Sequence, residues 1–507
     1  MATPPFDGYL SGKPMPMLIA DSFSSTRRPV LFGNGGAVSA AHPLAVAAGQ
    51  AMLAEGGSAV DAVIAGQAVM CVLTPDDCGL GGDALCMIRL PDGTVTAVNG
   101  TGAAPLRLVR ADDDGGNSVT VPGIVDAWQT MSHQWGRLPL ATLLAPAVKI
   151  AHDGMRPGPR LAETFQRYSG RLVRGGAAAW PMLTAPAGSI VRQPELAALL
   201  ADIGRRGRAA FYEGPIAEGI VEAVHQGGGV LDAADLALHG TVIAAPVTTT
   251  WRGRKVHVQP PVSQGVLLSM ALAGEERLGS LEARRRDHAC VELTQSSFAY
   301  RDRVGEGAAL LAAPLPVDLD KASRRGGPRA YLHTAGVAAS DASGMTVSSL
   351  ISVFDNFGSA IYVPGGGFTL NNRAAGFTSH PNECAGGKRP VHTLAPVLIE
   401  TEHGCVALAT PGADGQIQTL LQLLSAIFVE GTDIASAIAQ PRWRSENSRL
   451  LVEKTHPHLD GLANYGHDVI PIEDGDPRFG AIVCAGIERG QPFCCADWRR
   501  QTWAGVV

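Results

Sequence analysis

The chain has 507 residues, enough for several domains at about 100 to 200 residues each. Apolar residues make up 46% of it and charged residues 17%, a balance typical of a compact globular protein. The net charge of −6 gives no reason to expect nucleic acid as a partner, and the apolar stretches are too short to cross a membrane. Nine cysteines without disulfide-framework or zinc-ligand spacing, and a start without the pattern of a secretion signal, favour a cytoplasmic location.

The first part of the chain predicts helices with one early hairpin. Alanine-rich residues 42–72 are interrupted by Gly56-Gly57, which predicts two packed helices. A glycine-rich turn then precedes the apolar run 84–90, whose length suits a buried strand. A second strand is predicted at 94–98, where it completes a hairpin with the first. Residues 121–235 show mainly helical spacing. After the helical region, the patterns predict strands at 242–251 and 255–259, and helices at 265–278 and 287–303.

The pattern changes after residue 303. Residues 304–333 contain Ala, Gly, Pro and mixed charge without periodicity, which predicts an exposed, poorly ordered connector where a chain can be cut. The mixture of helices and strand pairs on either side favours an α+β or layered α/β body. Beyond the connector we expect strands at 336–340, 345–354, 396–400 and 405–409, and a helix at 415–429.

An ordered series of short motifs spans nearly the whole chain. The motifs are His42-Pro43-Leu44-Ala45, Gly56-Gly57-Ser58-Ala59-Val60-Asp61-Ala62, Gly79-Leu80-Gly81-Gly82, Val121-Pro122-Gly123, Phe211-Tyr212-Glu213-Gly214, Asp302-Arg303, Phe357-Gly358-Ser359, Leu370-Asn371-Asn372, Gly387-Lys388-Arg389-Pro390 and Thr410-Pro411-Gly412. In this order they resemble the landmarks of the γ-glutamyltranspeptidase superfamily. Any one motif could be coincidence, but the ordered set is hard to obtain otherwise. The resemblance implies the α+β fold of N-terminal-nucleophile hydrolases, a four-layer αββα sandwich.

The same resemblance implies a precursor that is cut at His333-Thr334 into a large part, 1–333, and a small part, 334–507. Thr334 alone is a weak signal, because threonine is common in strands. A threonine hydroxyl is also a poor nucleophile and needs a nearby base. A freed α-amino group, with a reference pKa of about 7.7 to 8.0, can be that base. Thr334 would then provide both nucleophile and base.

The attacked carbonyl develops an oxyanion, which needs preorganised donors. Gly412-Ala413 occupies the position of the family's paired glycines, and both backbone N–H groups can serve if the dihedral angles suit a residue with a Cβ. A plain turn before the next helix is the alternative. Ser352 matches a second hydroxyl residue that orients the nucleophile, although an ordinary strand serine would look the same. His392-Thr393 replaces the family's serine pair, so that Thr393 keeps a hydroxyl for substrate binding.

The substrate anchors differ from those of glutathione-cleaving transpeptidases. Those enzymes hold the γ-glutamyl group with an arginine and an acidic residue, and the matching positions here contain Thr101 and Gly376. Losing two charge-assisted contacts should weaken glutamyl recognition by orders of magnitude. Arg373 instead adds a positive charge nearby, which suits an anion without an amine.

Oxamate amidohydrolases are therefore the divergent members that we favour. Cephalosporin or glutaryl acylases, and γ-glutamyl hydrolases or transferases with unusual anchors, stay open as alternatives. A non-catalytic relative that keeps the scaffold as a binding module is the alternative of another class. No metal or organic cofactor is expected. The two parts of the precursor should remain together, and whether they assemble once or as a dimer of heterodimers stays open.

Overall fold

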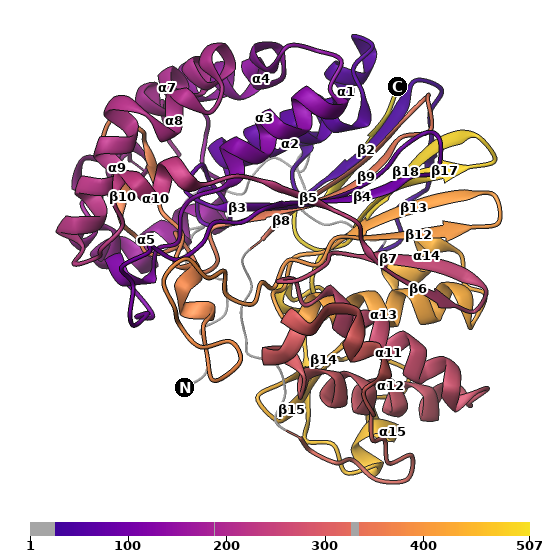
Figure 1. Ribbon diagram of the computed structural model, residues 1–507. Helices are drawn as coiled ribbons and strands as arrows, with labels where there is room; N and C mark the ends of the chain where they lie inside the picture. Colours follow the sequence, from indigo (N-terminus) through magenta and orange to yellow (C-terminus); the bar gives the residue numbers. More distant parts are fainter. Residues whose placement is uncertain (1–25, 187, 326–333) are drawn as a thin grey trace, which may run out of the picture.

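A computed structural model describes residues 26–186, 188–325 and 334–507. Two seven-stranded sheets pack face to face, and helices cover both outer faces (Figure 1). In that view α1 to α4 lie over one sheet and α11 to α13 over the other. The order of layers is therefore α, β, β, α, as the family resemblance implies.

The first sheet has the strand order β19-β2-β8-β9-β3-β4-β5, and its pairs are antiparallel. Its strands are β19 (Trp503–Val506), β2 (Gly36–Ala40), β8 (Ala335–Asp341), β9 (Thr346–Ser352), β3 (Asp83–Arg89), β4 (Val95–Gly100) and β5 (Val242–Ala244).

The second sheet has the order β1-β18-β17-β13-β12-β7-β6, again antiparallel. Its strands are β1 (Leu31–Phe32), β18 (Gln491–Ala496), β17 (Val483–Glu488), β13 (Gly404–Ala409), β12 (Val397–Thr401), β7 (Arg254–Val258) and β6 (Val247–Trp251). Shorter strands outside both sheets are β10 (Tyr362–Val363), β11 (Phe368–Thr369), β14 (Trp443–Glu446), β15 (Arg449–Glu453) and β16 (Val469–Ile472).

Most helices of the first part of the chain lie on the side of the first sheet (Figure 1). They are α1 (Pro43–Ala54), α2 (Ala59–Leu73), α3 (Ile124–Trp135), α4 (Leu140–Asp153), α5 (Pro159–Arg174), α6 (Pro181–Thr184), α7 (Pro194–Arg206), α8 (Ala209–Tyr212), α9 (Gly214–Gln226) and α10 (Ala233–Leu238). The break between α1 and α2 follows from Gly56-Gly57, and α2 restarts at a capping box between Ser58 and Asp61.

The helices beside the second sheet are α11 (Gly265–Leu278), α12 (Ala283–Phe298), α13 (Gly415–Phe428), α14 (Ile434–Ala439) and α15 (Leu459–Asn464). Alternate strand residues explain why both sheets are buried on two faces. Leu85 and Leu350, for example, belong to the core between the sheets, whereas Ile88 and Ile351 belong to the core under α1 and α2.

Two sequence expectations need correction. The run 242–251 is not one strand, because Pro246 has no N–H for a ladder and β5 and β6 join different sheets. The helix expected to 303 ends at Phe298. A 3-10 segment, η3 (Arg301–Ala312), follows and includes the start of the expected connector. Val304 and Leu310 are buried there, so apolar anchors order this segment.

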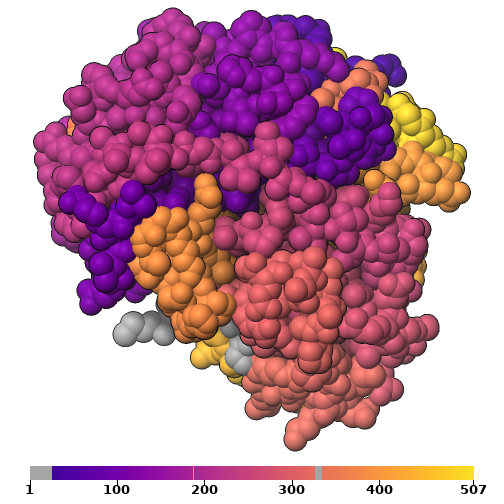
Figure 2. All heavy atoms as spheres, in the orientation of Figure 1, coloured from indigo at the N-terminus to yellow at the C-terminus, as the bar shows by residue number. Residues whose placement is uncertain are grey.

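The parts of the chain before and after residue 333 are interleaved in both sheets. In the first sheet, β8 and β9 lie between β2 and β3; in the second, β12 pairs with β7. On the surface in Figure 2, orange residues of the later part lie against purple and magenta residues of the earlier part, so the two parts are also in contact at the surface.

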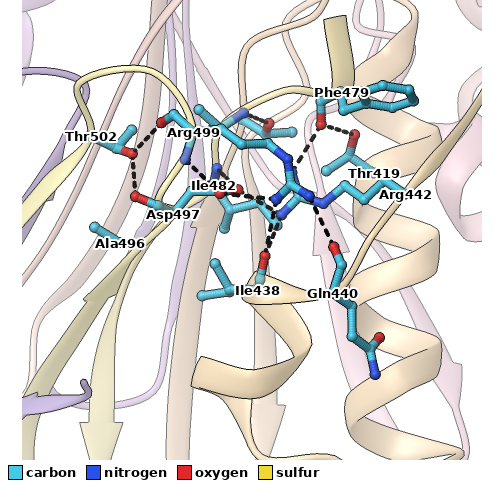
Figure 3. A network of polar contacts seen from close by, with 12 residues as sticks. Thr419, Ile438, Gln440, Arg442, Phe479, Ile482, Ala496, Asp497, Arg499 and Thr502 are labelled. Carbon is cyan, nitrogen blue, oxygen red and sulfur yellow. Dashed lines mark hydrogen bonds and ion pairs between the residues drawn. The ribbon is translucent and has the colours of Figure 1, made fainter. Parts of the chain in front are cut away.

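A buried network of charged residues ties the end of the chain to the second sheet (Figure 3). Arg442 and Arg499 both bond to the Asp497 carboxylate, at 2.6 and 3.1 Å. Arg499 also pairs with Glu453, and Thr502 donates to the Asp497 carbonyl at 2.7 Å.

Among the described residues, no helix is long and apolar enough to cross a membrane.

Candidate active site

Three neighbouring strand ends in the first sheet bring polar side chains together. In the β8–β9 ladder Ala335 pairs with Ile351, so that the next step of the same register sets Thr334 opposite Ser352. In the β3–β9 ladder Ser352 pairs with Asp83. All three residues share the face that looks toward the second sheet, since side chains alternate along strands and Leu85 and Leu350 lie on that face. A hydroxyl, a second hydroxyl and a carboxylate therefore form one row.

Thr334 comes directly before β8, and Ser352 is the last residue of β9. Their exposed fractions are both 2%. The Ser352 hydroxyl accepts a hydrogen bond from the N–H of Phe354 at 2.9 Å, which fixes the start of the loop after β9. His333, the residue expected before the cleaved bond, lies outside the described residues.

The turn at Gly412 and Ala413 follows β13 in the second sheet. Both residues have positive φ, 126° and 48°. Within the described part of the chain, neither N–H donates a hydrogen bond. Their carbonyls are held instead: the N–H of Gly415 bonds to Gly412 at 2.8 Å, and that of Gln416 to Ala413 at 3.1 Å. The turn thus presents two N–H groups without using them, which is what an oxyanion site needs.

Contacts across the sheets bring this turn to the row of strand ends. A Cβ built on Gly336, two residues after Thr334, would lie 3.5 Å from Cβ of Ala409, the last residue of β13. The side chain of Gln264 donates to the carbonyls of both Thr393 and Ala413, at 2.7 and 3.0 Å. The segments before β12 and after β13 are therefore held together at the end of the molecule where β8 begins.

Arg373 is fully buried and contacts this row directly. It lies in a short 3-10 segment, η4 (Arg373–Gly376), and its Nε donates to Oδ2 of Asp83 at 3.1 Å. Its guanidinium carbon lies 4.3 Å from the ring centroid of Phe354. Phe354 has a φ of 84°, a conformation that is rare for a bulky residue, so the surrounding structure holds this part of the backbone in a strained conformation.

His392 is the second donor to Asp83. Its Nδ1 accepts from the N–H of Leu394 at 3.2 Å, so that the proton of the neutral ring is on Nε2. Nε2 then donates to Oδ2 of Asp83 at 3.1 Å. Burial, and next the charge of Arg373, lowers the pKa of His392 to about 4. The ring is therefore neutral at pH 7, and its place beside Asp83 gives it no role as a base toward Thr334.

The same contacts fix the charge of Asp83. Burial alone would raise the pKa of its carboxyl, but the hydrogen bond from His392 and the Arg373 guanidinium outweigh burial and hold that pKa below its ordinary value. Asp83 is thus ionised. Its other oxygen, Oδ1, accepts from the N–H of Gly102 at 3.3 Å.

The remaining residues expected at the site are buried nearby but differ in their contacts. The Thr101 hydroxyl donates to Asn99 at 2.7 Å, which gives this side chain a turn-forming role. Thr393 is tied to the site through its carbonyl. Sequence reasoning did not select Asp83, although a carboxylate at the first position of a buried strand is a signal, because buried carboxylates are rare unless paired.

Two groups of potential metal ligands lie elsewhere among the described residues, on α12 and near α15. Each group joins α12 to a segment more than 150 positions later in the chain, so spacing along the sequence could not reveal the complete sets. Hydrogen bonds account for their contacts: His288 donates to the carbonyl of Asp318 at 2.8 Å, and the N–H of Ser323 donates to Glu292 at 2.9 Å. The groups are Asp287, His456 and His458, and His288, Glu292 and His467.

A four-layer αββα sandwich in which a threonine opens an inner strand, facing the gap between two sheets, is the architecture of N-terminal-nucleophile hydrolases. A family model described as gamma-glutamyltranspeptidase matches residues 45–321 and 311–507. The chain therefore belongs to the gamma-glutamyltranspeptidase family.

Several relatives and a solved structure are similar over nearly the whole chain. The glutathione hydrolase-like YwrD proenzyme of Bacillus subtilis is 30% identical over 88% of this chain and 93% of its own length. The oxamate amidohydrolase proenzyme of Klebsiella pneumoniae is 30% identical over 87% of this chain and 92% of its own. The crystal structure of a cephalosporin acylase from Bacillus halodurans superposes with a TM-score of 0.87 at 26% identity, covering 97% of this chain and 99% of that one.

Proposed function

We propose that the protein is a precursor that cuts itself before Thr334 and then hydrolyses a small anionic amide such as oxamate, with Thr334 as nucleophile. The observation that carries this proposal is the position of Thr334. It lies directly before an inner strand, opposite Ser352 in register, at the same end of the molecule as the N–H groups of Gly412 and Ala413, which have no acceptor among the described residues. Relatives named as proenzymes support the self-cleavage step.

The proposed chemistry uses only groups of this chain. The α-amino group freed at Thr334 takes the hydroxyl proton while Oγ attacks the amide carbonyl. The N–H groups of Gly412 and Ala413 stabilise the oxyanion of the tetrahedral intermediate. The amine leaves with the proton, and an ester on Thr334 remains until water attacks it with the same amino group as base. Ser352 orients the threonine side chain by its place across the ladder.

Arg373 supports an anionic substrate. It is a buried cation on the same row of strand ends, linked to Thr334 through Asp83 and Ser352. An amine on the substrate has no matching acidic partner at Gly376, which lies in η4 beside Arg373. The resemblance to an oxamate amidohydrolase at 30% identity agrees with this substrate class.

γ-Glutamyl hydrolysis is the second candidate, because a glutathione hydrolase-like protein is equally similar in sequence. Purified mature protein should be incubated with oxamate, glutathione and a glutaryl amide, and the release of ammonia and glutamate should be measured. Thr334→Ala serves as the inactive control. We expect ammonia from oxamate and little glutamate from glutathione. Rapid glutathione turnover would contradict the substrate assignment, and a wild-type protein that stays one band on a denaturing gel would favour a binding module.

A further inference from the structure

The Arg373 guanidinium is buried with more hydrogen-bond donors than the described residues can satisfy. Nε bonds to Asp83, but Nη1 and Nη2 have no hydrogen-bond partner among the described residues. Four N–H donors of a fully buried cation are thus left for a ligand. Leaving buried arginine nitrogens without a hydrogen-bond partner is costly, so the arrangement is that of a cation that binds an anionic ligand.

Two residues fix the direction in which these donors point. Oδ2 of Asp83 lies 3.1 Å from Nε of Arg373 and 3.1 Å from Nε2 of His392. With the Gly102 N–H on Oδ1, three donors lock the carboxylate, which can then hold only the Nε edge of the guanidinium. Phe354 covers the guanidinium at 4.3 Å. The Nη1–Nη2 end is therefore the edge that can bind a carboxylate with two parallel hydrogen bonds.

We propose that Asp83 is a specificity-determining residue of this enzyme: by holding Arg373 and His392 together, it directs the Nη1–Nη2 end of Arg373 at the carboxylate of the substrate. The inference rests on the proposed amidohydrolase function and goes further, because it assigns substrate selection to a residue that touches Arg373 rather than the scissile bond. The preferred substrate class is an amide whose molecule carries one planar carboxylate within reach of Thr334.

Matched acid and amide pairs test this inference. Oxamate and oxamide differ only in that a neutral amide replaces the carboxylate, and succinamate with succinamide and glutaramate with glutaramide extend the series. Mature wild-type enzyme should prefer the acid of the best pair by about 100-fold in kcat/KM, the value of two charge-assisted hydrogen bonds. Asp83→Asn removes the negative charge and replaces one of the two accepting oxygens by an NH2 donor, so we expect it to lose this preference mainly through a raised KM.

Glu275→Gln is the matched control, because Glu275 is another buried carboxylate paired with an arginine, Arg252, at 2.8 Å, and lies on α11. It should keep the acid preference. An Asp83→Asn enzyme that loses activity on acid and amide equally would show a structural role and overturn the inference. Arg373→Lys, which keeps the charge but not the fork, should also lose the preference and serves if Asp83→Asn does not mature.

Calorimetric titration with oxalate separates this inference from the proposed function, because binding needs no turnover. Mature wild-type protein should bind oxalate, and Asp83→Asn and Arg373→Lys should each bind it at least about 10-fold more weakly. If no amide of the series is hydrolysed but oxalate binding shows this pattern, the proposed function fails and the role of Asp83 stands. Equal oxalate binding by all three proteins overturns the role of Asp83.

Discussion

At the scale of single residues, the backbone of Gly412 and Ala413 decides whether their turn can offer two donors. The φ of 126° at Gly412 is disfavoured for any residue with a Cβ, although space for a Cβ exists, since the nearest atom would be Nη1 of Arg444 at 3.4 Å. The φ of 48° at Ala413 is the left-handed conformation, which alanine can adopt at a cost of about 1 kcal/mol. The family's second glycine is therefore dispensable here.

Exchanging these two residues separately tests the oxyanion role. Gly412→Ala should rotate the turn and lower kcat by about 100-fold to 1,000-fold, the usual effect of losing one oxyanion donor. Ala413→Gly should change kcat only a few-fold, because it relieves strain without removing an N–H. Steady-state kinetics on mature protein measure both. An unchanged kcat in Gly412→Ala would mean that the turn has no catalytic part.

In the proposed mechanism Thr334 acts twice, first on the carbonyl of the preceding residue and later on the carbonyl of the substrate. Thr334→Ala should leave the full-length precursor uncut and inactive. Thr334→Ser keeps a hydroxyl and should still cleave, more slowly, with some hydrolysis. Denaturing gels follow the cleavage, and mass spectrometry of the wild-type small fragment should give Thr334 as its first residue. Normal maturation of the alanine variant would remove the assignment of nucleophile and base together.

At the scale of elements, regular patterns were predictable from the sequence and crossings between layers were not. The spans of α1, α2, α11 and α13 follow from apolar periodicity and glycine breaks, because these signals are local. Periodicity could not show that β5 and β6 enter different sheets, since both have the same strand character. The same distinction holds for the candidate site. Thr334 and Gly412 could be predicted because they lie in recognisable motifs. Asp83 could not, because its contact with Arg373 joins residues 290 positions apart in the sequence.

The loop after α2 supports the loop that contains Phe354, and it also contains a buried carboxyl, that of Asp76, whose ionisation should make folding stability depend on pH. The carbonyls of Asp76 and Asp77 accept from the N–H groups of Phe357 and Val353, at 3.1 and 3.3 Å. Burial, and next repulsion from Asp77, raises the pKa of Asp76 to about 7, although Arg160 lies 3.0 Å away. At pH values between the ordinary pKa of an aspartate and 7, Asp76 is protonated in the folded chain and ionised in the unfolded chain. Folding stability therefore falls as pH rises through this window.

Asp76→Asn should remove this pH dependence. From pH 5 to pH 8 the free energy of unfolding of the parent protein should fall by on the order of 2 kcal/mol because Asp76 ionises. The variant should not show this decrease. Urea unfolding at both pH values, in an uncut Thr334→Ala background, measures the difference. Asp202→Asn, on the surface of α7, is the control and should follow the parent protein. A parallel loss in Asp76→Asn and the parent would contradict the raised pKa.

At the scale of the whole molecule, the buried charges in Figure 3 hold the chain end in place. Asp497→Ala would leave Arg442 and Arg499 without their shared carboxylate, and breaking a buried pair costs about 3 to 5 kcal/mol. Glu306→Ala, which removes the exposed pair with Arg303, should cost much less, because solvent screens an exposed pair. Urea unfolding in the uncut background compares the two variants. Similar losses in the free energy of unfolding would mean that the buried network contributes no more to stability than an exposed ion pair.

The interleaved strands have a consequence for how long a mature molecule survives. Once the chain is cut before Thr334, β8 and β9 still lie between β2 and β3, so that the fragments cannot part without opening the first sheet. Unfolding then turns one molecule into two, and recovery becomes a second-order encounter that slows on dilution. The lifetime of the active, cut protein should accordingly depend on the rate of unfolding rather than on the equilibrium between folded and unfolded states. Refolding yields of the cut protein should fall with dilution, whereas those of uncut Thr334→Ala should not.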